Sequence, residues 1–115
     1  MRRFNRTQIV MVDLGAINGQ VVGHEQANQR PCLIIQTLEF SKLAVVIPFT
    51  SKQPPSAIYS IVKIQKSTGG LTSDSFALCH QIRSISFQRI VRVVGNMPER
   101  DFNKILTVLT DFLDI

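Results

Sequence analysis

Aromatic side chains are scarce in this sequence: it has no tryptophan, one tyrosine and seven phenylalanines in 115 residues. That scarcity argues against an extended platform on which many nucleic-acid bases could stack. No apolar run approaches the roughly 20 residues needed to cross a bilayer, and no apolar signal core follows the basic first residues. We therefore expect one soluble domain, spanning residues 1–115, with no membrane segment and no export signal.

Cysteine is also rare, with only Cys32 and Cys79 present, both inside apolar segments. Such cysteines behave as small buried hydrophobic residues and are typical of a reducing cytoplasm, whereas a disulfide between them is the less favoured alternative. A zinc site combining them with His24 and His80 is disfavoured. Cys79 and His80 are neighbours on a predicted strand, and their side chains would point to opposite faces. We expect no metal and no cofactor.

Acidic residues are outnumbered: eight Asp and Glu face thirteen Lys and Arg, for a formal charge of +5. This excess favours a polyanionic partner, but charge alone does not distinguish RNA from DNA or from an acidic protein.

Short β-branched segments separated by turn residues predict six strands, at residues 8–14, 31–36, 43–48, 57–65, 75–83 and 90–94. Pro48 is expected to end the third strand because proline cannot donate to a ladder, and Gly95 to close the β part. The turn at residues 66–70 lacks the residue order of a P-loop, which excludes a nucleoside triphosphate site.

After Pro98 the period of the apolar residues changes to that of a helix. The stripe consists of Phe102, Ile105, Leu106, Leu109, Phe112 and Leu113. Pro98 fits the first helical position, and Glu99 and Asp101 suit the positive end of the helix dipole. Five or six strands followed by a helix predict a mainly β protein, built as a small, strongly bent antiparallel sheet or barrel.

Arg30 stands where a polar loop enters a buried strand. Pro31 restricts it to extended backbone, and its guanidinium is a planar fork of donors suited to phosphate. The alternative is an arginine that only begins a strand and pairs with a surface carboxylate. Thr50 and Ser51, just past the third strand, either donate to a phosphate or simply form a turn.

His80 is the candidate proton carrier, since an imidazole exchanges protons near neutrality. Strict alternation also places it on one strand face with Phe76, Leu78 and Ile82, so a buried core histidine remains the alternative. Other polar candidates flank these positions: His24, Glu25 and Gln26 before Arg30, and Gln81 and Arg83 after His80.

Taken in order, these segments resemble the MazF/PemK type of toxin endoribonuclease over nearly the whole chain. The segments are Val12–Leu14, Gly23–Gln26, Arg30–Gln36, Pro48–Ser51, Gly70–Ser75 and Gln81–Arg83. The resemblance implies an SH3-like barrel of five to seven antiparallel strands with a C-terminal α-helix. It further implies a homodimer, metal-independent cleavage of single-stranded RNA at short sequences, and neutralisation by a cognate antitoxin whose chain covers the RNA groove.

By matching position, Arg30 and Thr50 correspond to the family's catalytic pair, whereas His24, Glu25, Gln26 and Gln81 correspond to positions that line its RNA groove. Ser51 and Arg83 are added as candidate RNA contacts. The sequence departs from the family pattern at two places. Thr7-Gln8 replaces the usual Gly-Asp that opens the first strand, and His80 replaces an acidic residue.

In the mechanism that follows, the RNA's own 2′-hydroxyl attacks the phosphate and leaves a 2′,3′-cyclic phosphate and a 5′-hydroxyl. Arg30 would supply positive charge, Thr50 would hold a non-bridging oxygen, and His80 would act as base or acid. Two other functions stay open: a gyrase-inhibiting toxin of the same fold, and a barrel that binds nucleic acid without cutting it.

Overall fold

The computed structural model describes residues 3–15, 29–55 and 58–115, which form seven strands and one α-helix. The strands are β1 (Gln8–Asp13), β2 (Gln29–Leu38), β3 (Leu43–Thr50), β4 (Ile61–Ile64), β5 (Ser75–Leu78), β6 (Arg83–Ser86) and β7 (Ile90–Asn96), and the helix is α1 (Glu99–Leu113). Three short 3-10 helices connect them: η3 (Thr68–Gly70), η4 (Cys79–Gln81) and η5 (Phe87–Arg89).

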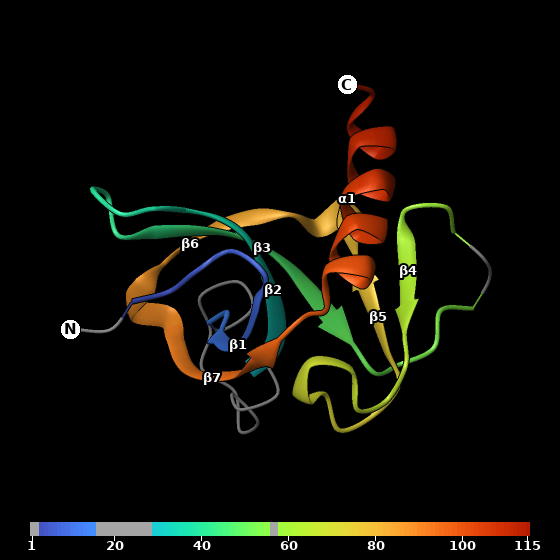
Figure 1. The fold of residues 1–115 in the computed structure, drawn as a ribbon, viewed down its shortest axis with the longest axis horizontal. Helices are drawn as coiled ribbons and strands as arrows, with labels where there is room; N and C mark the ends of the chain where they lie inside the picture. The colour runs from blue at the N-terminus through green and yellow to red at the C-terminus, as the bar shows by residue number, and fades with distance from the viewer. Residues whose placement is uncertain (1–2, 16–28, 56–57) are drawn as a thin grey trace.

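All the strands join one antiparallel sheet in the order β4-β5-β3-β2-β1-β7, with β6 also paired to β3. The sheet is strongly bent, and α1 stands beside β4 and in front of β5 (Figure 1). The expectation of a mainly β protein with a C-terminal helix is confirmed. The closed barrel is not: within the described residues the ladder is open, with β4 and β7 at its two ends.

β3 causes the bend because it changes partner along its length. One edge pairs with β2 through residues 43–48, whereas the other pairs with β6 through residues 43–46 and then with β5 through Phe49 and Thr50. Pro48 falls between those two pairings, where no strand needs its missing N–H. The prediction that Pro48 ends the strand is therefore wrong, and β3 runs on to Thr50.

Both faces of the central strands are buried, which explains their nearly continuous apolar sequences. Adjacent side chains alternate between two clusters: Ile9, Leu33 and Ile47 join the core under α1, whereas Val10, Cys32 and Val46 join a second core. α1 contributes Phe102, Ile105 and Leu109 to the first core. A hydrophobic core thus packs against each face of the central strands.

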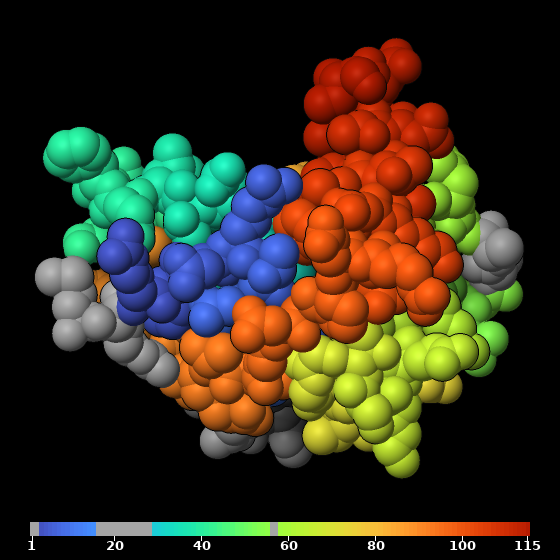
Figure 2. Space-filling view, viewed as in Figure 1, coloured from blue at the N-terminus to red at the C-terminus, as the bar shows by residue number. Residues whose placement is uncertain are grey.

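Helix α1 begins one residue later than predicted. Pro98 is the residue before the helix, with extended backbone, and it makes no side-chain cap hydrogen bond. The predicted stripe is largely buried, but Leu113 remains 43% exposed, and the last turn projects beyond the rest of the molecule (Figure 2). No helix in the described ranges is long and apolar enough to cross a membrane.

The predicted fifth strand, residues 75–83, is instead β5, the one-turn helix η4 and the start of β6. The predicted fourth strand shrinks to Ile61–Ile64, and residue 57 lies outside the described residues. Gly95 does not close the β part but lies within β7, where it pairs with Ile9 of β1. A Cβ at this position would overlap the backbone oxygen of Gly69. At this close approach only glycine fits.

Both cysteines are free and fully buried, as expected, and they lie in different cores. Burial raises the pKa of the Cys32 thiol to about 12 and that of Cys79 to about 11. Both therefore remain neutral thiols at physiological pH, and neither is an activated nucleophile.

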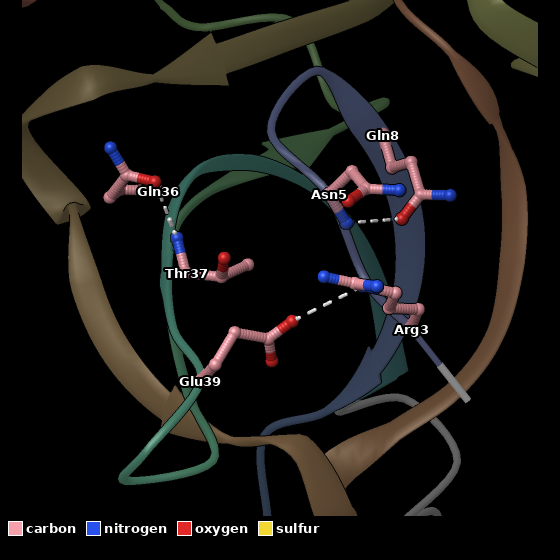
Figure 3. Close-up of polar contacts among 6 residues, drawn as sticks. All are labelled: Arg3, Asn5, Gln8, Gln36, Thr37 and Glu39. Carbon is pink, nitrogen blue, oxygen red and sulfur yellow. Dashed lines mark hydrogen bonds and ion pairs between the residues drawn. The ribbon is translucent and has the colours of Figure 1, made fainter. Parts of the chain in front are cut away.

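The N-terminal segment is tied down at the end of the sheet that carries the β2–β3 hairpin (Figure 3). Arg3 Nε lies 3.7 Å from Glu39 Oε1, and the Asn5 backbone N–H donates to Gln8 Oε1 at 2.8 Å. Because both charged side chains are exposed, this ion pair contributes less than about 1 kcal/mol.

Candidate functional site

A cavity of about 320 Å³ brings together Arg30 from β2, Thr50 from β3 and His80 from η4. These are the three residues for which the sequence predicted a catalytic role. The remaining lining residues are Lys52, Gln53, Pro54, Pro55, Ile58, Ile61 and Leu78. Arg30 and His80, which are 50 positions apart in the chain, thus line the same cavity.

Strand register explains why Arg30 and Thr50 meet. β2 and β3 are antiparallel with Cys32 opposite Pro48, so the same register continued by two residues puts Arg30 opposite Thr50. Side chains directly opposite on an antiparallel pair share a face and lie about 5 Å apart at Cβ. On its other side Arg30 pairs with Val12 of β1, which fixes its backbone between two strands.

Thr50 does form a turn, as one of the two interpretations predicted. Its Oγ1 accepts the backbone N–H of Lys52 at 3.2 Å. This contact uses one lone pair and leaves the hydroxyl hydrogen available to another acceptor. The turn and phosphate binding are therefore compatible, because the Thr50 hydroxyl accepts a hydrogen bond in the turn and can still donate one to a phosphate oxygen.

His80 is exposed, so the buried-core alternative for it is wrong. The physical reason is that the chain leaves the strand at Cys79 and turns through η4, which ends the alternation on which that alternative depended. The argument that Cys79 and His80 point to opposite strand faces fails for the same reason. Within the described ranges, no three His, Cys, Asp or Glu side chains are close enough to hold a metal ion.

Two contacts hold the His80 ring. Ser60 Oγ lies 2.9 Å from His80 Nδ1, and the Phe112 ring of α1 meets it edge-on with centroids 6.4 Å apart. Ser60 is only 3% exposed and its hydroxyl has no other partner among the described residues. A buried hydroxyl that donates to nothing costs about 1–3 kcal/mol, which favours donation from Ser60 to Nδ1. The imidazole tautomer that accepts at Nδ1 carries its hydrogen on Nε2.

The cavity is electropositive. Arg30 and Lys52 line it, and no described lining residue is an aspartate or a glutamate. Arg30 forms no ion pair with any described residue. The charges of both Arg30 and Arg83 oppose the burial-driven rise in the pKa of Cys32, so both guanidinium groups act on that same thiol.

The sequence profile described as "PemK-like, MazF-like toxin of type II toxin-antitoxin system" matches residues 5–113. The chain belongs to this PemK/MazF family. Endoribonuclease EndoA of Bacillus subtilis (strain 168) is 32% identical over 88 residues, which cover 74% of this chain and 76% of that protein.

Solved structures share the PemK/MazF fold. An endoribonuclease in complex with its cognate antitoxin, from a mycobacterial species, matches with a TM-score of 0.75 and 20% identity over 98% of this chain and 97% of that one. MazF of Deinococcus radiodurans matches with a TM-score of 0.72 and 19% identity over 96% of each chain.

Not every residue predicted for a PemK/MazF site lies on the cavity wall. Ser51, Gln81 and Arg83 are exposed close by, after Thr50, in η4 and at the start of β6, but none of them lines the cavity. His24, Glu25 and Gln26 lie outside the described residues.

Ser60 and Lys52 were missed by the sequence analysis. A serine among the inward positions of an apolar segment signals a buried hydrogen bond, so Ser60 could have been found, although not its partner. Lys52 had no such signal, because its role depends on the turn after Thr50.

Proposed function

We propose that this PemK/MazF chain is an endoribonuclease toxin that cleaves single-stranded RNA at specific short sequences without a metal ion. The observation that supports this most strongly is the convergence of Arg30, Thr50 and His80 on one electropositive cavity. An RNA phosphodiester needs no external nucleophile, because its 2′-hydroxyl lies next to the phosphorus. The protein then has to orient the linkage and stabilise the added negative charge.

In the proposed reaction the 2′-oxygen bonds to phosphorus while the bond to the 5′-oxygen breaks. Solvent water accepts the proton lost by the 2′-hydroxyl and supplies the one gained by the leaving 5′-oxygen, which yields a 2′,3′-cyclic phosphate and a 5′-hydroxyl. Arg30 stabilises the phosphorane-like charge through its guanidinium fork, and Thr50 donates its hydroxyl hydrogen to a non-bridging oxygen. No side chain of the protein has to form a covalent bond with the RNA.

His80 acts in this scheme as a hydrogen-bond donor to the phosphate through Nε2. The Ser60 contact favours the form with hydrogen on Nε2, and that nitrogen has no partner among the described residues. We therefore propose that His80 stabilises the negative charge on the phosphate, which replaces the hypothesis that it acts as base or acid.

We predict that His80→Ala lowers kcat about 100-fold, the typical loss for one well-placed donor. His80→Gln, which keeps an N–H donor at similar reach, should remain within about tenfold of the wild-type rate. Both rates are measured on one RNA across a range of pH, with Gln88→Ala in η5 as an exposed control. Equal losses in His80→Ala and His80→Gln, with one limb missing from the pH–kcat profile, would instead make His80 a proton carrier.

We propose two protein partners for the toxin, of which a solved relative supports the first. One solved relative is a complex with its cognate antitoxin, and we propose that a cognate antitoxin covers this cavity in the cytoplasm. We also propose a homodimer in which two copies line one RNA groove. Light scattering after size exclusion measures the mass of the assembly.

The function is tested by incubating the purified protein with single-stranded RNA in excess chelator. We expect discrete products at short recognition sequences, formed at the same rate with and without chelator. Binding without products would favour a nucleic-acid-binding barrel, and neither binding nor products would favour the protein-targeting, gyrase-inhibiting alternative. Products formed only without chelator would contradict metal independence.

A further inference from the structure

A second hollow of about 320 Å³ adjoins the cavity and contains Lys63 of β4 and Phe76 of β5. The two hollows share five wall residues: Gln53, Pro54, Pro55, Ile58 and Ile61. The two hollows therefore lie side by side over the β3-β5-β4 part of the sheet.

Strand register sets Phe76 between Thr50 and Lys63. Phe76 is directly opposite Thr50 of β3 on one side and directly opposite Lys63 of β4 on the other. Opposed residues share a face, so the three side chains form a row across the strands. With strands 4.7–4.9 Å apart, this row spans about 10 Å from Thr50 to Lys63.

This row lies on the face of the sheet that does not build the core under α1. The intervening residues Val62, Ile64 and Ala77 belong to that core, whereas Lys63 is exposed and Phe76 is only partly buried. Lys63 forms no ion pair with any described residue, and no described residue lining either hollow is a carboxylate. An aromatic ring between a phosphate site and an uncompensated cation matches the alternation of base and phosphate in single-stranded RNA.

We propose that Phe76 stacks on the base of a nucleotide next to the cleaved linkage and that Lys63 binds the phosphate beyond that base. This subsite rests on the proposed function, because the Arg30 and Thr50 cavity sets where the cleaved phosphate lies. In this proposal a single strand of RNA occupies both hollows and crosses β3, β5 and β4 in turn.

The probe for the subsite is a fluorescein-labelled, mixed-sequence RNA dodecamer that is 2′-O-methylated throughout and therefore lacks the attacking hydroxyl. Its affinity is measured by fluorescence anisotropy at several salt concentrations. Lys63→Ala should reduce the magnitude of the slope of log K against log[salt] by about 0.7, the value for one phosphate contact on a single strand. Lys66→Ala, which changes an exposed lysine outside both hollows, should leave the slope unchanged.

Phe76→Leu keeps an apolar side chain but removes the ring. It should weaken binding of the dodecamer roughly 5- to 150-fold, the range for loss of one base–aromatic stack. Phe40→Leu is the matched control, since Phe40 is fully exposed at the tip of the β2–β3 hairpin. On an abasic version of the dodecamer, wild-type protein and Phe76→Leu should bind equally.

The outcomes separate the subsite from the function. If wild-type protein cleaves RNA but both variants bind the dodecamer like wild type, the subsite is wrong and the function stands. If the variants show the expected changes but no RNA is cleaved in the chelator experiment, Phe76 and Lys63 still bind RNA as proposed and only the cleavage function fails. If light scattering shows that Phe76→Leu or Lys63→Ala halves the mass of the assembly, this face is a contact between copies and the proposal is overturned.

Discussion

Arg30→Ala is expected to lower kcat/KM for RNA cleavage about a thousandfold or more without unfolding the protein. Arg30 is half-buried, lines the cavity together with Thr50 and has no ion-pair partner among the described residues, so its removal leaves no carboxylate unpaired among them. Loss of one preorganised donor typically costs 10²- to 10³-fold, and this guanidinium supplies two donors together with a full positive charge.

Two variants control the Arg30 experiment. Arg30→Lys keeps the charge but loses the planar fork, so we expect a rate between wild type and Arg30→Ala. Arg92→Ala removes an exposed arginine from β7, at a separate hollow, and should cleave like wild type. Urea unfolding of each variant checks the fold. Cleavage by Arg30→Ala within tenfold of the wild-type rate would exclude Arg30 from the mechanism.

A single 2′-deoxy sugar on the 5′ side of the cleaved linkage is expected to abolish cleavage at that linkage. The proposed reaction has no other nucleophile: both cysteines are buried thiols with raised pKa, and neither lines the cavity. Loss of the 2′-hydroxyl removes the attacking oxygen while leaving the charge of the phosphate, and therefore its binding to Arg30, unchanged.

The matched control for this substitution carries the 2′-deoxy sugar one nucleotide further along the same RNA and should still be cut. Product ends are read by mass spectrometry, with a 2′,3′-cyclic phosphate expected on the control products. Efficient cleavage at the deoxy-substituted linkage would show that water or a protein group attacks the phosphate.

Much of the architecture was predictable because it depends on local pattern. The apolar β-branched segments of β1, β2, β3 and β7 and the stripe of α1 all lie within a few residues of their predicted places. The errors occur where a contact distant in sequence overrides a local rule. Pro48 is tolerated because β3 changes partner there, and Gly95 continues a strand because it pairs with Ile9 of β1.

Local features made Arg30 and Thr50 candidates for phosphate binding, since one precedes a proline and the other follows the predicted strand, but their catalytic roles were predicted from the family resemblance. Arg30, Thr50 and His80 were all chosen from the sequence, and all three line the cavity. What local pattern could not supply was the environment of His80, because Ser60 is 20 residues away and Phe112 is 32 residues away. Those contacts exist only after the sheet and α1 have packed.

The sequence by itself thus determined which segments become strands or helix, which charges predominate and which side chains are suited to phosphate. Only the tertiary structure decided that the sheet stays open, that His80 leaves β5 to be held by Ser60, and that Thr50, Phe76 and Lys63 form one row. The reason is physical. Propensity and periodicity act over a few residues, whereas strand register and partner choice are set by packing between segments far apart in the chain.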